Sequence, residues 1–431
     1  MIWYNYVRIF TDSRAIQGDF MKNTLPIAVI GLGQRGMGLL RPILRMKDIS
    51  VVAVCDSYQD RIEQAQKLSK QLGRALPRGY VDYKEMIEKE QISAVVISCS
   101  WKCHTEISLY CMEKGIPVGC EVGGVHDLNE CWELVDAYER TKTPYMFLEN
   151  CCYGEYELAC LNMVKKGIFG TVVSCEGGYK HDLRDEISGG ELNRHYRLEE
   201  YINSNCENYP THEIGPIAKI LDINRGNRMV ELISISSKSV GLNEYIKDNL
   251  DKKHIKKLEN TVFKQGDIVN TLIKCENGET ISISLDTTLP RPYSRGFIVH
   301  GTKALYSEEG NYYFDDNNKR HKAVHWILSK FFNNGKKMAK KYRHEIWKNF
   351  KRHPVKSGHG GMDYLVLRAF FESVMEGHKV MPLDVYDAVT WMAITALSAK
   401  SIETGSIVEF PDFTRGAYKE RKQEKLNIWY V

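Results

Sequence analysis

The sequence predicts an α/β fold, with an N-terminal doubly wound parallel sheet followed by a C-terminal α/β domain built on a largely antiparallel open sheet. Short apolar runs alternate with helical stretches through residues 25–148, which is typical of parallel strands covered on both faces. After residue 149 the runs alternate apolar and polar residues, as in antiparallel strands with one covered face. Because 431 residues exceed the roughly 250–300 that one core usually serves, we expect domains at 25–148 and 149–431, preceded by an extension at 1–24.

In the first domain the apolar runs predict strands at 27–30, 51–55, 94–98, 118–120 and 145–148. Helices are expected between them, at 34–46, 59–72, 83–89, 104–114 and 129–141. Pro42 must lie at a kink or near the end of its helix, because it lacks the backbone N–H that a helix interior needs. Gly115 is a signal for the end of a helix.

In the second domain a helix at 156–166 should be closed by Gly167. Strands are expected at 171–179, 230–237, 267–275 and 280–287, with Glu276-Asn277-Gly278 as the turn of a hairpin. Two helices, at 359–376 and 384–402, end the predicted elements.

The composition, 43% hydrophobic and 26% charged residues, indicates an ordinary globular chain and excludes a disordered or collagen-like one. No apolar run approaches the roughly 18 residues of a membrane span, and the N-terminus lacks a secretory signal, so we expect a cytoplasmic protein. None of the twelve cysteines has Cys-x-x-Cys spacing, and His353 and His359 lack the spacing of metal ligands, so we expect no metal.

Residues 320–356 carry twelve Lys or Arg residues and one acid, interleaved with Trp326, Phe331, Phe332, Trp347 and Phe350. Such a stretch is compatible with nucleic-acid binding. We favour a solvated lobe anchored by its aromatic residues and expect no nucleic-acid partner, because a run of charge alone is weak support for one.

The stretch Gly31-Leu32-Gly33-Gln34-Arg35-Gly36 is a G-x-G-x-x-G fingerprint between a predicted strand and a predicted helix. Its glycines permit the tight turn, the approach of a pyrophosphate and close helix–strand packing. Asp56 ends the next strand, where an acid accepts hydrogen bonds from ribose hydroxyls and repels a 2′-phosphate. Residues 25–148 are therefore predicted to be a Rossmann domain that binds NAD.

Ligands of this fold lie at the carboxyl ends of the strands, which carry Trp101, His104, Glu121 and, after the last strand, Asn150. We expect Glu121 beside the nicotinamide or its ribose and Trp101 over the ring. With this layout the sequence resembles the Gfo/Idh/MocA oxidoreductases. Typical dehydrogenases of that family end the fourth strand in Glu-Lys-Pro with a catalytic lysine, whereas Val122 follows Glu121 here.

Within that family the chain resembles glycoside hydrolase family 109, whose founding members are α-N-acetylgalactosaminidases. The resemblance covers residues 25–415 and is carried by 148–154 (LENCCYG), 178–184 (GYKHDLR), 209–216 (YPTHEIGP), 224–226 (NRG), 342–348 (YRHEIWK) and 358–363 (GHGGMD). It implies cleavage through a transient 3-keto sugar: NAD⁺ oxidises C3, the C2 proton is lost, the glycosidic bond breaks by elimination, water adds, and C3 is reduced again. Such a site needs proton-transfer groups rather than two opposed carboxylates.

Tyr179 and His212 are the residues we expect to transfer protons. Further candidates for contact with the sugar are Tyr209, His181, Asp182, Arg194 and His359. Cys151 and Cys152 are expected to be small buried residues rather than nucleophiles.

The leading hypothesis is therefore an NAD-dependent glycosidase of the family-109 type. A plain NAD-dependent sugar dehydrogenase on the same fold is the alternative, opposed by the missing lysine at Val122. A non-catalytic protein that senses NAD or a sugar is a third. The open sheet of the resembling family also implies a homo-oligomer, either a dimer or a tetramer.

Overall fold

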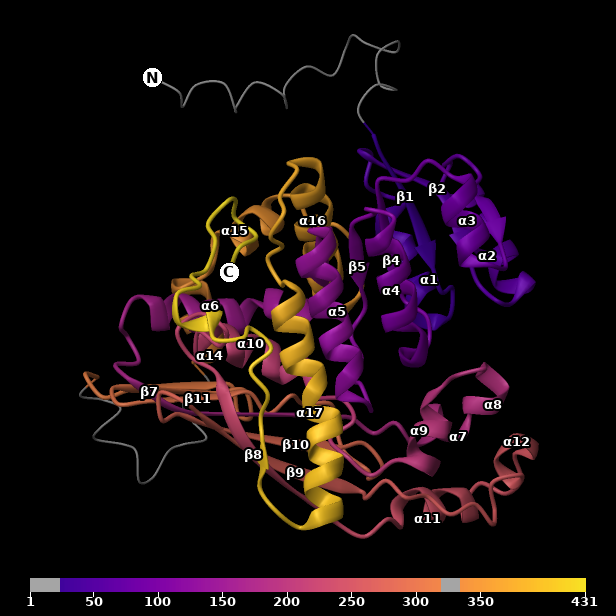
Figure 1. The fold of residues 1–431 in the computed structure, drawn as a ribbon. Helices are drawn as coiled ribbons and strands as arrows, with labels where there is room; N and C mark the ends of the chain where they lie inside the picture. Colours follow the sequence, from indigo (N-terminus) through magenta and orange to yellow (C-terminus); the bar gives the residue numbers. More distant parts are fainter. Residues whose placement is uncertain (1–23, 319–333) are drawn as a thin grey trace, which may run out of the picture.

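The computed structural model describes residues 24–318 and 334–431, and their strands form two sheets (Figure 1). The N-terminal sheet has six strands in the order β3-β2-β1-β4-β5-β6, all paired in parallel. Its strands are β1 Leu25–Ile30, β2 Ile49–Cys55, β3 Arg78–Tyr80, β4 Ala94–Ile97, β5 Val118–Cys120 and β6 Tyr145–Phe147. Every residue of β4, β5 and β6 is buried, as the apolar runs predicted.

The helices that connect these strands are α1 Gln34–Ile43, α2 Gln59–Gln71, α3 Tyr83–Lys89, α4 His104–Glu113 and α5 Leu128–Thr141. The predicted elements of this domain match within three residues. Pro42 lies in the last turn of α1, so the helix ends before Met46. The short edge strand β3 was not predicted, because three residues with none buried carry no apolar pattern.

The C-terminal sheet has eight strands in the order β13-β12-β11-β7-β10-β9-β8-β14, in which only β7 and β10 pair in parallel. The strands are β7 Val172–Lys180, β8 Met229–Ser236, β9 Ile268–Cys275, β10 Thr280–Asp286, β11 Ile298–Gly301, β12 Ala304–Ser307, β13 Tyr312–Asp315 and β14 Val408–Glu409. The predicted hairpin at Glu276-Asn277-Gly278 is confirmed between β9 and β10, with Gly278 at φ +99°.

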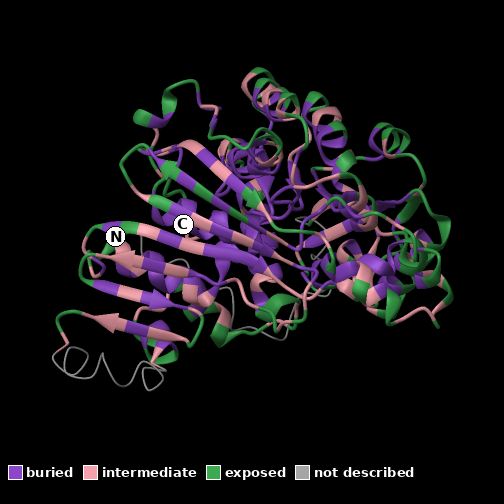
Figure 2. Ribbon diagram, turned by 90° about the horizontal axis from the view of Figure 1, so that it is seen from below, coloured by how far each residue is buried: buried purple, intermediate pink, exposed green. Residues whose placement is uncertain are grey.

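Helices cover one face of this sheet and leave the other open. α10 (Thr211–Ile220) packs against β7, and α17 (Val385–Thr404) packs against β8. Figure 2 shows the other face, along which buried and exposed residues alternate; in β9, for example, Asn270, Leu272 and Lys274 are exposed between buried neighbours. The expected α/β fold with a largely antiparallel open sheet is confirmed.

Several short elements were not predicted. Five lie between β7 and β9: α7 Arg184–Ser188, α8 Gly190–Asn193, α9 Arg197–Asn203, α11 Gly241–Lys247 and α12 Lys253–Lys256. Helices of four to seven residues present too few turns for a helical period to show in the sequence. The remaining helices are α6 Glu155–Lys165, α14 Gly335–Lys341, α15 Glu345–Arg352 and α16 Met362–Met375.

The structure describes the basic stretch from residue 334 on, so Trp326, Phe331 and Phe332 lie outside the described residues. Of the expected extension at 1–24, residues 1–23 also lie outside them. α15 buries Trp347, whose Nε1 donates to the Tyr153 carbonyl over 2.8 Å. Phe350 packs against Trp347 with ring centroids 5.3 Å apart. In this half of the stretch the aromatic side chains therefore anchor a basic surface. Among the described residues no helix is both long and apolar enough to cross a membrane.

A buried ionic network fastens the start of α17 to the rest of the C-terminal domain. Asp387 accepts hydrogen bonds from Lys219 Nζ (2.9 Å) and Arg225 Nη1 (2.7 Å), and all three side chains are at most 5% exposed. Asp384 caps the helix by accepting the backbone N–H groups of Tyr386 and Asp387.

Replacing Asp387 by alanine leaves the buried Lys219 without its carboxylate and leaves Arg225 with Asp384 alone, so we expect the free energy of unfolding to fall by about 3–5 kcal/mol. Urea titration measures the change. The control is Asp136→Ala, which removes an exposed partner of Arg415 and should change stability by less than about 1 kcal/mol. Equal effects of the two substitutions would contradict the assignment.

Candidate active site

The Gly31–Gly36 turn has the shape of a phosphate cradle. Gly31 has φ +88°, and a Cβ there would lie 2.4 Å from the backbone nitrogen of Cys99. A Cβ on Gly36 would lie 1.9 Å from the Gly31 carbonyl oxygen, whereas one on Gly33 would contact only Arg61, at 3.6 Å. The turn is therefore closed toward the sheet and open at Gly33. The first turn of α1 has no side-chain cap and no acid, so its free N–H groups are available to an anion.

Asp56 lies beside this cradle, at the end of β2. Its Oδ2 accepts the backbone N–H of Leu32 over 2.7 Å, and its Oδ1 accepts that of Tyr58 over 3.0 Å. Each carboxylate oxygen has a second lone pair, so both can still accept ribose hydroxyls. The backbone N–H of Leu32 is therefore bonded to Asp56 and is not free for a phosphate. Gln34, at the start of α1, is exposed. The cradle and the acid fit the adenosine and pyrophosphate of a dinucleotide.

Arg35 reaches from the turn to both domains. Its Nη2 donates to Glu121 Oε1 (2.7 Å) and its Nη1 donates to Asp363 Oδ2 (2.9 Å). The other oxygen of Asp363 accepts Asn150 Nδ2 over 2.7 Å, and His359 Nδ1 lies 3.0 Å from the same carboxylate. Glu121, Asn150 and His359 therefore belong to one ionic network around the phosphate turn. In this network Asp363 has a pKa well below its usual range: burial raises it, but His359 and Arg35 outweigh that effect.

His104 and Trp101 lie near the expected nicotinamide end. Burial lowers the pKa of His104 to about 4, so its ring is neutral. Its Nε2 donates to the Cys99 carbonyl over 3.2 Å, which leaves Nδ1 as an acceptor that is buried and has no partner among the described residues. A Cβ on Gly123 would lie 3.3 Å from this nitrogen and 2.9 Å from Trp101. His104 Nδ1, next to Gly123, is therefore placed to accept a hydrogen bond from a donor group of a bound cofactor.

A buried histidine–carboxylate pair adjoins this end of the sheet. His212 Nδ1 lies 2.8 and 3.0 Å from the two oxygens of Glu149. Because a carboxylate only accepts, Nδ1 carries the hydrogen, and Nε2 faces the Tyr209 hydroxyl at 3.4 Å. Burial raises the pKa of Glu149, but His212 and the N–H of Cys151 outweigh it, and the net pKa lies below the usual value. Glu149 is thus an anion that orients His212.

Tyr179 lies next to this pair, with its ring 4.4 Å from Tyr209 and 5.7 Å from His212. Its hydroxyl is 3.3 Å from His181 Nδ1. Burial raises the pKa of Tyr179 to about 12, although the positive charge of Arg197 opposes this. Tyr179 therefore keeps its proton at neutral pH. Burial lowers the pKa of the neighbouring His181, so this imidazole is a poor source of positive charge for the Tyr179 hydroxyl.

Two residues that the sequence analysis did not single out complete the cluster. Arg197 lies over the Tyr209 ring (4.9 Å), the Trp101 ring (5.6 Å) and the Tyr179 ring (5.9 Å). Tyr293 is half-exposed and packs edge-on against His181 and Tyr179. Neither belongs to a motif. Glu149, by contrast, follows the end of β6, as Asp56 and Glu121 follow the ends of theirs, and that position was a signal for it.

Other predicted residues lie outside the cluster. Asp182 is held by Arg184 in two hydrogen bonds of 2.9 and 2.7 Å. The structure places Arg194 on Asp60 and Tyr58, beside the adenosine end of the groove. His359 contacts Arg35 and Asp363, yet it is near enough for its charge to act on His181. Their contact with a sugar stays a prediction.

Cys151 and Cys152 are buried, and burial raises the pKa of both thiols well above the usual value. Among the described residues, Glu149, Cys151 and His212 place potential metal-ligand atoms within 4.8 Å of one another. The hydrogen bonds between Glu149 and His212 and the protonated thiol account for this group without an ion.

Val122, where the related dehydrogenases carry a lysine, is buried and apolar.

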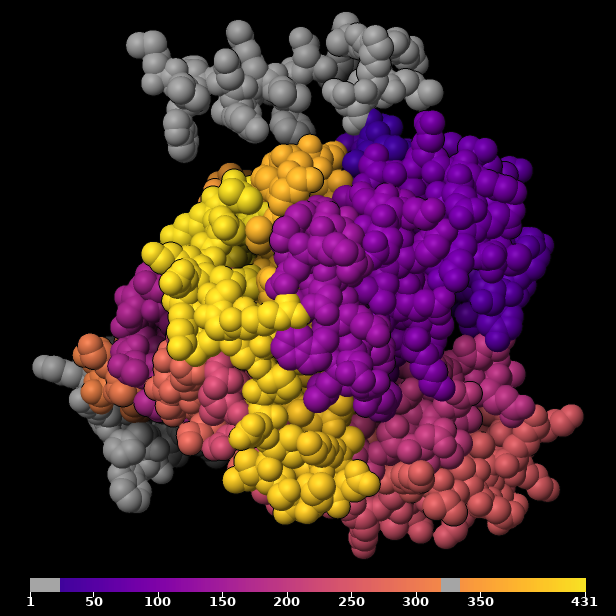
Figure 3. All heavy atoms as spheres, viewed as in Figure 1, coloured from indigo at the N-terminus to yellow at the C-terminus, as the bar shows by residue number. Residues whose placement is uncertain are grey.

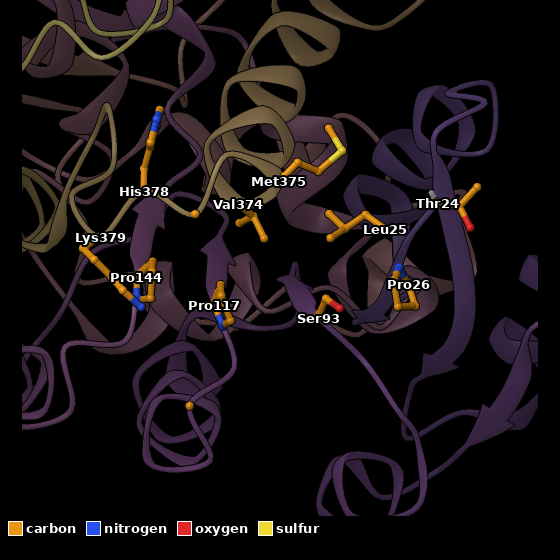
Figure 4. A pocket seen from close by; sticks show the side chains of 12 residues that line it. Thr24, Leu25, Pro26, Ser93, Pro117, Pro144, Val374, Met375, His378 and Lys379 are labelled. Carbon is orange, nitrogen blue, oxygen red and sulfur yellow. The ribbon is translucent and has the colours of Figure 1, made fainter. Parts of the chain in front are cut away.

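A cavity of about 640 Å³ lies at the opposite edge of the parallel sheet (Figure 4). It is lined at the amino ends of β1, β5 and β6 and at the end of α16 by Thr24, Leu25, Pro26, Ser93, Gly115, Pro117, Pro144, Val374, Met375, Gly377, His378 and Lys379. Ligands of open α/β sheets bind at the carboxyl ends, so this cavity is separate from the candidate active site.

Two family models match the chain. "Oxidoreductase family, NAD-binding Rossmann fold" matches residues 25–148, and "Glycosyl hydrolase 109, C-terminal domain" matches residues 153–420. The chain is 38% identical over 423 residues to a glycosyl hydrolase family 109 protein of Stenotrophomonas maltophilia, covering 92% of this chain and 90% of the relative. It is 35% identical over 423 residues to an alpha-N-acetylgalactosaminidase of Tannerella forsythia, covering 92% and 88%.

Solved structures with the same fold include a levoglucosan dehydrogenase in complex with NADH and levoglucosan, with a TM-score of 0.66 and 17% identity, covering 90% of this chain and all of that one. A myo-inositol 2-dehydrogenase from Lactobacillus plantarum superposes with a TM-score of 0.62 at 17% identity, with the same coverage. At this identity the likeness shows the fold alone.

Gly36→Ala should lower the affinity for NADH by at least about 10-fold, because the new methyl group forces the phosphate turn apart. Fluorescence titration with NADH measures the affinity. Gly38→Ala is the matched control: its Cβ meets open space in the same helix, so it should bind NADH normally and gain about 0.5–1 kcal/mol of stability. Normal binding by Gly36→Ala would contradict the assignment of the turn.

Proposed function

The chain belongs to glycoside hydrolase family 109, and from this we propose that it is a glycosidase of the α-N-acetylgalactosaminidase type that acts on a carbohydrate with a resident NAD. The fold supplies a nicotinamide-cofactor domain, and Asp56 favours NAD over NADP. One observation carries the proposal. The Glu149–His212 pair and Tyr179 lie beside the dinucleotide groove, and the dehydrogenase lysine position is the buried Val122.

Glu149 in the cluster and Asp182 outside it do not form the opposed carboxylate pair of an ordinary glycosidase. Glu149 is fully buried behind His212, and both oxygens of Asp182 are bound by Arg184. Neither can stand against a carboxylate across a sugar ring. The remaining proton carriers of the cluster are imidazoles and phenols, foremost His212 and Tyr179, which suits cleavage through proton transfers at carbon-bound and hydroxyl hydrogens.

NAD, when bound, supplies the transient oxidation of C3 that makes the C2 proton acidic. His212, oriented by Glu149, presents Nε2 as the proton acceptor for a sugar hydroxyl. Tyr179, which keeps its proton at rest, donates it from its hydroxyl to the departing glycosidic oxygen, and the tyrosinate that remains accepts the C2 proton, so the elimination balances. Arg197 lies over the aromatic wall formed by Trp101, Tyr179 and Tyr209 and stabilises negative charge that develops on the sugar.

The direct test is a panel of nitrophenyl glycosides, including the α-N-acetylgalactosaminide, incubated in D₂O with NAD⁺. We expect release of nitrophenol, deuterium at C2 of the product and no net NADH. NADH that accumulates without release of nitrophenol would show a sugar dehydrogenase instead. Silence on the whole panel, with NAD bound, would favour a sensor of NAD or sugar.

Glu149→Gln should lower kcat by about 10²- to 10⁴-fold, since it removes the anion that orients and stabilises the protonated His212. NADH affinity should stay unchanged, which separates this effect from misfolding. Glu376→Gln is the control, because Glu376 is an exposed carboxylate that pairs with another histidine, His378, away from the site. A kcat of Glu149→Gln within twofold of wild type would contradict the role.

We also propose that the chain forms a homo-oligomer, a dimer or tetramer, through the open sheet face. Leu272 is 56% exposed and Ile235 is 69% exposed there, on the neighbouring strands β9 and β8. Exposed aliphatic side chains on adjacent strands favour a protein partner.

Leu272→Glu should therefore reduce the molar mass measured by size-exclusion chromatography with light scattering. Leu76→Glu is the control for added charge, because Leu76 is similarly exposed but lies in the N-terminal domain, away from the open sheet. A monomeric wild-type protein would contradict the proposal.

A further inference from the structure

Residues 189–203, here called the strap, belong to the C-terminal domain but lie along the carboxyl edge of the parallel sheet. The strap contains α8 and α9, which lie below the N-terminal domain in Figure 1. In Figure 3 its atoms meet the lower edge of that domain. The dinucleotide groove opens at this same edge. The strap therefore lies where the outer wall of the groove must be.

Arg194 fastens the strap at the adenosine end. Its Nη1 and Nη2 donate to the two oxygens of Asp60 over 3.0 and 2.7 Å. Its guanidinium lies 4.2 Å from the centre of the Tyr58 ring. A second arginine ties the strap backbone, because Arg61 Nη2 donates to the Asn193 carbonyl over 3.2 Å.

These contacts continue into the residues that fit the cofactor. Arg61 Nη1 lies 3.6 Å from Asp56 Oδ2, and the same nitrogen is 3.6 Å from where a Cβ of Gly33 would stand. Tyr58, on which Arg194 stacks, donates its backbone N–H to Asp56. The residues that hold the strap therefore contact Asp56, which we expect to bind the ribose, and lie beside Gly33 of the phosphate turn.

The other end of the strap is fastened at the nicotinamide end. The Tyr196 ring lies 4.7 Å from Trp101. Lys102 Nζ donates to Glu199 Oε2 over 2.7 Å, and His126 Nε2 lies 2.6 Å from Glu200 Oε2. The strap is therefore attached to the N-terminal domain at both ends of the groove.

The first fastening point coincides with the end of α8. Arg194 is the C-cap of this helix, with φ +52° in the left-handed region where helices commonly end. The backbone N–H of His195 donates to the Gly190 carbonyl over 2.8 Å and closes the turn. The side chain of Arg194 therefore leaves the helix end toward Asp60 and Tyr58.

We propose that the strap completes the dinucleotide site and that Arg194 retains the cofactor by fastening the strap over its adenosine end. The inference rests on the proposed function and deepens it. A reaction that oxidises and then reduces the same sugar has no need to exchange its cofactor, whereas a dehydrogenase must exchange it in every cycle. A strap held at both ends of the groove suits an enzyme that keeps its cofactor through the whole reaction.

The test is the rate of NADH release, read from its fluorescence after the loaded protein is mixed with excess NAD⁺. Arg194→Ala should release NADH about 3- to 10-fold faster than wild type, the effect of losing one exposed ion pair and one cation–π contact. Arg228→Ala is the matched control, because Arg228 also pairs with a carboxylate, Glu276, and lies over a tyrosine, Tyr418, away from the groove. It should release NADH at the wild-type rate.

A charge exchange guards against simple misfolding. Asp60→Arg and Arg194→Asp should each speed release, and the double variant should return to within about twofold of wild type. If Arg194→Ala releases NADH at or below the wild-type rate, the role of the strap is contradicted and the proposed function is unaffected. If the wild-type protein binds no dinucleotide, both the role of the strap and the proposed function are contradicted.

Discussion

The guanidinium of Arg35 is the contact on which the arrangement of the two domains around the site depends. Arg35 belongs to the phosphate turn, and its two terminal nitrogens bind Glu121 after β5 and Asp363 on α16. Asp363 in turn binds Asn150, which follows β6. One side chain thus links the cofactor turn, two strand ends and a helix of the second domain. Its bidentate geometry sets direction as well as distance, which a lysine cannot do.

This network also determines which groups are left for chemistry. Glu121 and Asp363 are both paired with Arg35, and Glu149 is bound to His212, so these buried carboxylates orient other groups rather than react. In the function that we propose, proton transfer then falls to the imidazole of His212 and the phenol of Tyr179. The strap encloses the same groove from the other side. The buried carboxylates thus position other side chains, and the groups left to react beside the cofactor are neutral acids and bases.

Much of the fold was predictable because it depends on local pattern. The parallel strands are continuous apolar runs, the fingerprint requires glycines at close approaches, and β9 and β10 alternate visibly. The short helices α7–α9 and the edge strand β3 were not predictable, since their few residues carry no period. In the site, Asp56, Glu121, Tyr179 and His212 followed from strand ends and motifs. Arg197 and Tyr293 reach the cluster from segments whose sequence gives no sign of it.

By itself the sequence determined the type of each domain, the dinucleotide turn and the family, because these rest on residue spacing and on backbone conformations that only certain residues adopt. Only the tertiary structure decided the partners of the charged side chains. It placed Arg194 on Asp60 rather than in the cluster, His359 with Arg35, and Glu149 behind His212. The physical reason is that an ion pair depends on distances of a few ångströms between residues far apart in the chain, and those distances exist only after both sheets have packed.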